Sequence, residues 1–321
     1  MRTFLRFAMA VVMLVSTVLL AGSAQAYSGA FFPTQSKGNR GVDVLAAQYL
    51  LRHHRQSADA DSVFGTGTDT AVRAFQKARS LDVDGIIGPN TWARLAVTTR
   101  QGDTGDAVRA LQVQLNAKHN AKLGVSGTYD TATRTAVTNF QRHAGIGVDG
   151  ITGPATWKNL LWHYDYPAMS SGLCDKDPDN NGTVNWGTGA TVGQLEEAVR
   201  RFVPSGNGKV PLGDISREHG GSLNGHSSHQ LGLDVDLWPI RTDSAQCSAG
   251  RITWQSSTYD RAATRKLVQE IRATAPGHVK LIFFNDPVLI REGLTSQYAN
   301  HDNHLHVRYC ERVHPNSLYQ C

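Results

Sequence analysis

The chain has 321 residues, of which 40% are hydrophobic and 18% are charged. This length and composition exclude a disordered or low-complexity protein and allow two or three domains with hydrophobic cores. The formal net charge of +5 is small and spread along the chain. It does not indicate nucleic acid as a partner, and it gives only weak support for an anionic polymer.

The first 26 residues have the three parts of a secretory signal peptide. Arg2 and Arg6 precede an apolar run over residues 7–20, and Ala24-Gln25-Ala26 is a small-residue cleavage site. The apolar run is shorter than the roughly 20 residues needed to span a bilayer, which disfavours a membrane anchor. We therefore expect an exported protein, secreted or periplasmic, whose mature chain starts at Tyr27 and does not attach to a membrane.

All four cysteines lie after residue 170, so they belong to a C-terminal domain. Export would place them in an oxidising compartment, where an even number favours disulfides. Three pairings are possible. A short local loop between Cys310 and Cys321 is preferred, which leaves Cys174 to pair with Cys247. A thiolate zinc site is disfavoured because the sequence contains no C-x-x-C pair.

Two segments repeat each other at an offset of about 65 residues. Each ends in the motif D-G-x-x-G-P-x-T-W, at residues 84–92 and 149–157. Apolar residues spaced by three and four positions predict three short helices in each repeat. The proline after the second glycine of the motif is typical of a first helical turn. Four aromatic residues at helical spacing are expected in the core: Phe75, Trp92, Phe140 and Trp157.

These repeats resemble the peptidoglycan-binding domain 1 family of small three-helix modules, which occur in tandem on wall-targeted hydrolases. The resemblance covers about residues 36–163, with the first repeat at 36–97 and the second at 100–163. It implies peptidoglycan as an anchoring ligand. Because neither repeat shows a nucleophile with a base, or a metal cluster, we expect them to bind rather than to catalyse.

Residues 164–180 are predicted to form a linker, because the segment is rich in Ser, Gly and Asp. Asp177, Asp179 and Asn181-Gly182 fit the first half of an EF-hand calcium loop, but Thr188 stands where the closing glutamate should be. We expect an ordinary turn here, and the sequence does not decide whether it binds calcium.

Two histidine-rich segments about 70 residues apart are the candidates for chemistry. A strand over residues 233–238 would put Asp234 and Asp236 on one face, beside His229. A second strand would put His304 and His306 on one side. Zinc accepts imidazole and carboxylate ligands, and a catalytic site keeps one position for water. The set that fits is His229, Asp236 and His306, with His304 beside the metal as acid or base.

The C-terminal part resembles the penicillin-insensitive murein endopeptidases, within the zinc peptidases that include lysostaphin-type and D-Ala-D-Ala enzymes. The shared patterns are S-x-H-x-x-G-x-x-x-D at residues 227–236 and H-x-H at residues 304–306. The resemblance implies a small α+β domain with an antiparallel sheet over residues 181–321. It also implies the zinc ligands His229, Asp236 and His306, a catalytic His304, and His226 and His301 as further catalytic-site histidines. An E-x-W-H segment is missing, so histidine replaces glutamate as the candidate base.

The sequence thus predicts a multidomain protein with two all-α modules followed by an α+β zinc peptidase domain. We expect a secreted zinc-dependent endopeptidase that hydrolyses peptide cross-links of peptidoglycan. Two alternatives remain open: an amidase or carboxypeptidase of the same zinc group, or a non-catalytic wall-binding protein with a structural zinc. The scissile bond and the oligomeric state are not determined by the sequence.

Overall fold

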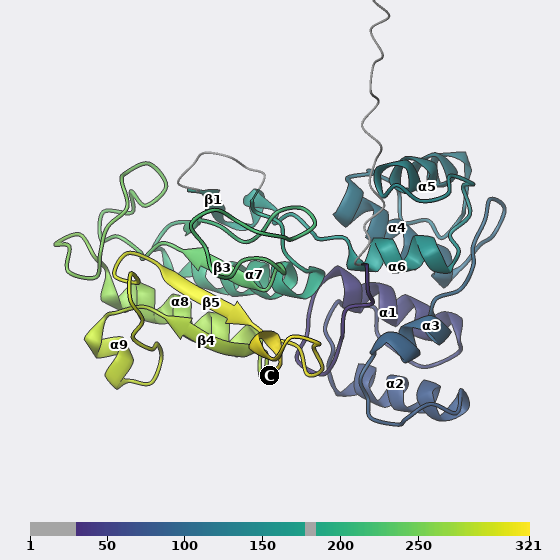
Figure 1. Cartoon of the computed structure of the whole chain (residues 1–321), viewed down its shortest axis with the longest axis horizontal. Helices are drawn as coiled ribbons and strands as arrows, with labels where there is room; N and C mark the ends of the chain where they lie inside the picture. Colours follow the sequence, from purple (N-terminus) through teal and green to yellow (C-terminus); the bar gives the residue numbers. More distant parts are fainter. Residues whose placement is uncertain (1–29, 177–183) are drawn as a thin grey trace, which may run out of the picture.

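The computed structural model describes residues 30–176 and 184–321. Within them, a helical N-terminal half precedes a domain built on a five-stranded sheet (Figure 1). The expected signal peptide, residues 1–26, and the calcium-like turn, residues 177–182, lie outside the described residues. Among the described helices, none combines the length and the apolar character required to cross a membrane.

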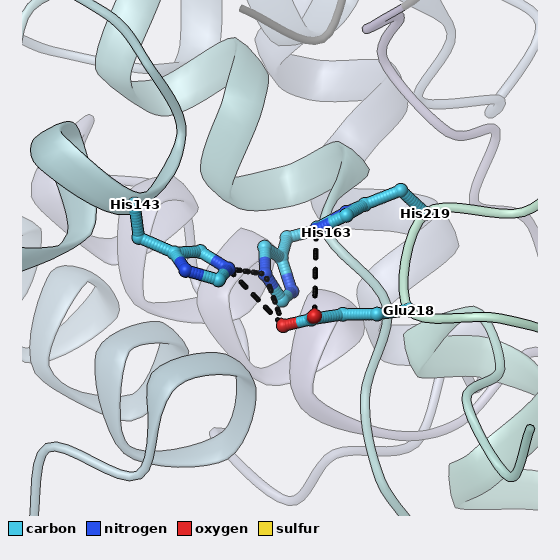
Figure 2. A group of neighbouring side chains, drawn as sticks. All are labelled: His143, His163, Glu218 and His219. Atoms are coloured by element: carbon cyan, nitrogen blue, oxygen red, sulfur yellow. Dashed lines mark hydrogen bonds and ion pairs between the residues drawn. The ribbon is translucent and has the colours of Figure 1, made fainter. Parts of the chain in front are cut away.

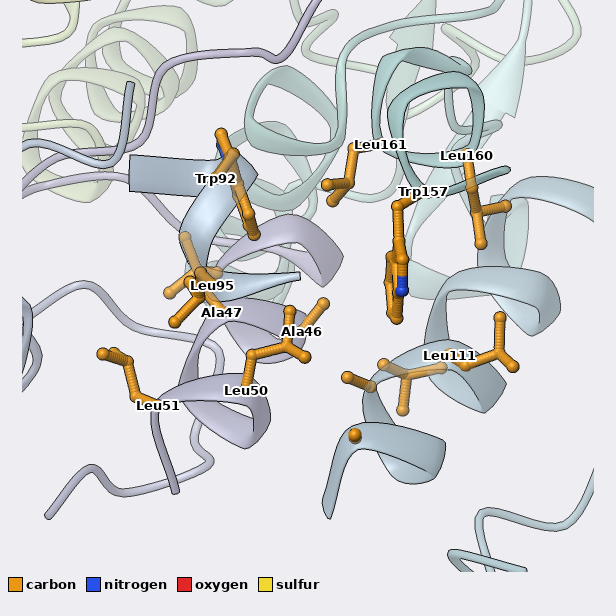
Figure 3. Close-up of a cluster of buried hydrophobic side chains, with 14 of the residues drawn as sticks. Ala46, Ala47, Leu50, Leu51, Trp92, Leu95, Leu111, Trp157, Leu160 and Leu161 are labelled. Carbon is orange, nitrogen blue, oxygen red and sulfur yellow. The ribbon is translucent and has the colours of Figure 1, made fainter. Parts of the chain in front are cut away.

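Each repeat folds into the three helices that its pattern predicts. The first contains α1 (Val42–His53), α2 (Thr66–Ala78) and α3 (Pro89–Leu95), and the second contains α4 (Asp106–His119), α5 (Thr131–His143) and α6 (Pro154–Trp162). The four aromatic residues expected in the core are at most 1% exposed. Figure 3 shows Trp92 and Trp157 among aliphatic side chains from α1 and α4.

One glutamine in each repeat explains the D-G-x-x-G-P motif. Gln76 Nε2 donates a hydrogen bond to Asp84 Oδ1 at 2.7 Å, and Gln141 Nε2 donates to Asp149 Oδ1 at the same distance. Gly85, which follows the first aspartate, has a φ of 73°, in the left-handed region that favours glycine. The loop before the last helix is therefore held by the same contact in both repeats.

The two repeats pack through α1 and α4, and a buried ion pair joins these helices. Lys118 Nζ lies 2.7 Å from Asp43 Oδ1, and neither side chain is more than 1% exposed. Gln114 donates to the same carboxylate, and Lys118 also donates to the Leu161 carbonyl. The two charges are thus compensated by each other and by neighbouring protein groups, as a buried pair requires.

Replacing Lys118 with alanine is expected to lower the free energy of unfolding by about 3–5 kcal/mol, because Asp43 would keep a buried charge without its cation. Urea unfolding of the full chain measures this loss. Lys77→Ala, at an exposed position of α2, is the control and should change stability by at most about 0.5 kcal/mol. Similar stability of the two variants would show that the ion pair does not hold the repeats together.

The C-terminal domain is α+β, as predicted. Its strands run in the order β1-β2-β3-β5-β4. They are β1 (Leu173–Asp175), β2 (Val210–Leu212), β3 (Asp234–Leu237), β4 (Val279–Phe283) and β5 (Leu305–Tyr309). The remaining elements are α7 (Gly189–Phe202), α8 (Arg261–Thr274), α9 (Pro287–Arg291) and the 3₁₀ turns η1 (Met169–Ser171), η2 (Val203–Ser205) and η3 (Ser317–Tyr319).

The sequence predicted an antiparallel sheet, but the observed sheet is mixed because the strand pair at one edge is parallel. β2, β3, β5 and β4 pair antiparallel, but β1 pairs parallel with β2. A parallel pair needs a long crossover connection, and α7 lies within the one between these strands. α7 and α8 pack together and contribute to the same hydrophobic core as the strands (Figure 1).

The segment expected to be a linker, residues 164–180, is part of the folded C-terminal unit over its described residues. It contains η1 and β1, and Leu173 joins the core of the sheet domain. Tyr164 is also buried. The sheet domain therefore begins before residue 181. The composition of residues 164–180 did not reveal this, because β1 has only three residues and is too short to show a strand pattern.

The repeats lie directly against the sheet domain, although the two have separate hydrophobic cores. α1 packs on α7, where a Cβ at Gly193 would collide with the backbone of Gly41. Arg40 Nε donates to the Thr274 carbonyl, which ends α8, at 3.1 Å. Side-chain and backbone contacts thus fix the first repeat to α7 and α8 of the domain.

Both preferred disulfides are confirmed. Cys174 bonds with Cys247 and Cys310 bonds with Cys321, and no described cysteine is free. The first bond ties β1 to the loop after β3, and the second ties the C-terminus to the end of β5.

Candidate active site

The pairing of β3 with β5 assembles the candidate site. Asp236 lies directly opposite His306 in this antiparallel ladder, and Asp234 lies opposite Arg308. Because side chains alternate along a strand, the apolar residues between them enter the core and these four share the other face. β5 begins at Leu305, so His304 lies just before the strand rather than within it.

Three donor atoms converge at this point. His229 Nε2 lies 3.2 Å from His306 Nδ1 and 3.3 Å from Asp236 Oδ1, and the latter two atoms are 3.0 Å apart. Zinc bonds of about 2.0–2.1 Å place tetrahedral donors about 3.3–3.4 Å apart. The separations and the donor types therefore fit zinc.

Other hydrogen bonds orient the two imidazoles. His229 Nδ1 lies 2.8 Å from the Ile215 carbonyl and therefore donates to it, and His306 Nε2 lies 3.0 Å from Asp234 Oδ1. These contacts direct the facing nitrogens, Nε2 of His229 and Nδ1 of His306, toward Asp236 Oδ1, so that all three atoms could bind one metal ion. His229 also has a φ of 64°, a left-handed conformation that is uncommon for a residue other than glycine.

Asp234 organises a buried network behind these histidines. Its carboxylate accepts hydrogen bonds from Arg308 Nε at 2.6 Å, Tyr319 Oη at 2.7 Å and the His229 backbone N–H at 3.0 Å. Burial acts to raise the pKa of Asp234, but His306 and Arg308 outweigh it and hold the pKa low. The aspartate therefore stays ionised, which suits a group that orients a ligand histidine.

The three remaining predicted histidines line the same cleft, which has a volume of about 600 Å³. His304 Nε2 is 3.8 Å from Asp236 Oδ1, and its ring lies 4.5 Å, centroid to centroid, from that of His301. His226 Nε2 is 3.0 Å from Asp214 Oδ2. The structure thus brings all six predicted site residues to one cleft.

The environments of these histidines separate their pKa values. Burial lowers the pKa of His304 to about 4, whereas the hydrogen bond to Asp214 raises the pKa of His226. Burial also acts against protonation of His306, but hydrogen bonds to Asp234 and Asp236 raise its pKa to about 9. The pKa values of His304 and His226 are thus shifted in opposite directions in one cleft, which is typical of paired acid and base groups.

Several residues besides the six predicted site residues also line the cleft. Trp238 and Arg251 stack at one wall, with the guanidinium carbon 4.4 Å from the ring centroid, and Phe283 and Tyr298 stack at another, with centroids 4.5 Å apart. Arg308 also lines the cleft. Because it lies two positions after His306 on β5, strand alternation could have predicted that the two side chains share a face. The walls therefore combine aromatic surface with cations.

Known protein families match both the helical repeats and part of the C-terminal domain. Residues 40–95 and 104–160 each match the peptidoglycan binding domain family, and residues 180–282 match the penicillin-insensitive murein endopeptidase family. His229 and Asp236 lie within the endopeptidase match, whereas the H-x-H segment lies beyond its end.

Several wall enzymes are similar to parts of the chain. N-acetylmuramoyl-L-alanine amidase CwlM from Mycobacterium tuberculosis is 36% identical over 253 residues, covering 70% of this chain and 58% of the relative. Zinc D-Ala-D-Ala carboxypeptidase from Streptomyces albus G is 37% identical, over 32% of this chain and 39% of the relative. N-acetylmuramoyl-L-alanine amidase CwlL from Bacillus licheniformis is 35% identical, over 43% and 39% respectively. The chain therefore spans less than two thirds of each of these relatives.

Proposed function

Because two peptidoglycan-binding repeats precede a domain that matches the murein endopeptidases, we propose that the protein is an exported, wall-associated zinc peptidase. Its reaction is the hydrolysis of peptide cross-links in peptidoglycan. The observation that supports this most is the convergence of two imidazole nitrogens and one carboxylate oxygen, 3.0–3.3 Å apart, beside a further histidine in an open cleft.

His229, Asp236 and His306 would hold the zinc ion, with Asp234 fixing the ring of His306. When bound, zinc supplies a Lewis acid that polarises a peptide carbonyl and activates water. A serine or cysteine nucleophile is then unnecessary, and all four cysteines are in disulfides.

His304 would transfer the proton. Its Nδ1 lies 2.8 Å from Asn303 Oδ1 and donates to that oxygen, which leaves Nε2 as the acceptor on the Asp236 side. A base must lie within hydrogen-bond reach of the group from which it takes the proton. His226, held by Asp214, and His301, beside His304, would assist in the cleft.

The repeats would keep the enzyme on its polymer. Tethering to the wall raises the effective concentration of substrate at the cleft without adding catalytic contacts. This assignment predicts that binding and hydrolysis reside in different parts of the chain.

A fragment of residues 27–163 is expected to sediment with insoluble peptidoglycan and to release no soluble fragments. The repeats have a hydrophobic core of their own, and the candidate site lies entirely outside them. Co-sedimentation and analysis of the supernatant check this expectation, with full-length His306→Ala as the matched binding control. Digestion of the wall by the fragment would show that the division of roles is incorrect.

Mass spectrometry of defined cross-linked muropeptides, incubated with the full chain and with His306→Ala, tests the proposed reaction. Cross-link hydrolysis converts dimers to monomers with intact stems. The cation at Arg251 and the carboxypeptidase relative favour a second candidate, removal of one terminal residue. Release of whole stems from the glycan would instead identify an amidase, and absence of products would indicate a non-catalytic wall-binding protein.

A further inference from the structure

A second group of metal-type donors lies where the second repeat meets the sheet domain. His143 ends α5 and His163 follows α6, whereas Glu218 and His219 lie on the loop between β2 and β3. Figure 2 shows the three histidines gathered around the glutamate carboxylate. All four residues can place a donor atom within 4.8 Å of the others.

The donor separations are close to those of a tetrahedral site. His143 Nε2 lies 3.1 Å from Glu218 Oε1 and 3.2 Å from His163 Nε2, and the distance from His163 Nε2 to Glu218 Oε1 is 3.5 Å. These values bracket the 3.3–3.4 Å or so that zinc bonds of about 2.0–2.1 Å produce. His219 Nε2 is 3.7 Å from Glu218 Oε2, within reach of the same centre.

His163 is oriented as metal-binding histidines usually are. Its side chain is 1% exposed, and its Nδ1 donates to the Tyr164 carbonyl at 2.8 Å, which leaves Nε2 as an acceptor facing the group. The ring of Trp162 stacks on that of His219. The His143, Glu218 and His219 side chains are 20–35% exposed, so an ion can enter from solvent.

Comparison of the two repeats argues against a purely structural need for these histidines. At the offset of 65 residues that relates α2 to α5, the first repeat has Ala78 where the second has His143, and Thr98 where the second has His163. The three-helix fold forms in both. The two imidazoles therefore occur only in the repeat whose helix ends face Glu218.

We propose that His143, His163, Glu218 and His219 form a second metal site, for zinc or a similar divalent transition ion, that clamps the second repeat to the sheet domain. Three imidazoles with one carboxylate suit zinc, and hard cations such as magnesium prefer oxygen donors. The site is independent of the proposed catalytic metal, because it shares no residue with the cleft.

Zinc binding by the full chain tests this site when the catalytic ligands are removed. A His229→Ala/His306→Ala variant, stripped with chelator and dialysed against zinc alone, is expected to keep about one zinc per chain. Adding His143→Ala and Glu218→Gln should abolish that binding. His119→Ala is the matched control, because its ring lies 5.1 Å from that of His143 but is not one of the four donors; zinc should be retained.

Thermal unfolding provides a second measurement. Zinc should raise the melting temperature of the His229→Ala/His306→Ala variant, since a ligand that binds only the folded state stabilises it. It should not raise that of the same variant carrying Glu218→Gln, a nearly isosteric change that serves if His143→Ala does not fold. Two results would overturn the proposal. One is a folded His229→Ala/His306→Ala variant that binds no zinc, and the other is equal zinc binding by this variant with and without Glu218→Gln.

Discussion

Replacing His306 with alanine is expected to remove about one zinc ion per chain and to reduce muropeptide hydrolysis to the background level. His306 lies opposite Asp236 in the β3–β5 ladder, and its ring contacts Asp236 through Nδ1 and Asp234 through Nε2. Without it, two protein ligands remain where a catalytic zinc site uses three. Elemental analysis and mass spectrometry of the same samples measure both losses.

His53→Ala is the control for this experiment, because His53 is exposed at the end of α1, in the first repeat. It should change neither zinc content nor turnover. The His306→Ala protein should still sediment with peptidoglycan, since the repeats are unchanged. Retention of all zinc and of full turnover by His306→Ala would contradict the ligand assignment.

Replacing His304 with alanine is expected to separate chemistry from metal binding. Zinc content should stay nearly the same, because Nε2 of His304 lies 3.8 Å from Asp236 Oδ1 and outside the three donors that converge. Turnover of cross-linked muropeptides should fall by about 10²-fold or more, the usual loss for a general acid or base. Zinc analysis on the assayed samples, at several pH values, makes the comparison direct.

The two possible failures of this prediction have different meanings. Loss of zinc in His304→Ala would make His304 a ligand and require a different ligand set. Retention of both zinc and turnover would move the proton-transfer role to His301 or His226, which line the same cleft. Alanine variants of these two residues, measured in the same assay, would then identify it.

Local patterns explain what could be predicted from the sequence. Helical spacing and the repeated motif were sufficient for the six helices of the repeats, and strand alternation was sufficient to put Asp234 and Asp236 on one face. The six predicted site residues meet because two short motifs each occupy one strand or its approach. The disulfides followed from the even number of cysteines and the short spacing of one pair.

Long-range contacts explain what could not be predicted. β1 is too short to show a pattern, and it becomes a strand because β2 pairs with it. Tyr319 contacts Asp234 from a turn 85 residues away, and Glu218 contacts His143 across 75 residues. No spacing within either segment encodes such partners, so the donor group between the second repeat and the sheet domain was missed.

The close packing of α1 on α7 has a consequence for how the proposed enzyme would work on an insoluble polymer. When binding modules are joined to a catalytic domain by a flexible linker, the domain can reach every bond within the length of that linker. Here the contacts of Gly193 with Gly41 and of Arg40 with α8 hold the first repeat at a set position relative to the sheet domain. The bonds that reach the cleft would then lie at a fixed distance from the peptidoglycan bound by the repeats. Cleavage would therefore follow the repeat spacing of the polymer instead of occurring at random positions along it.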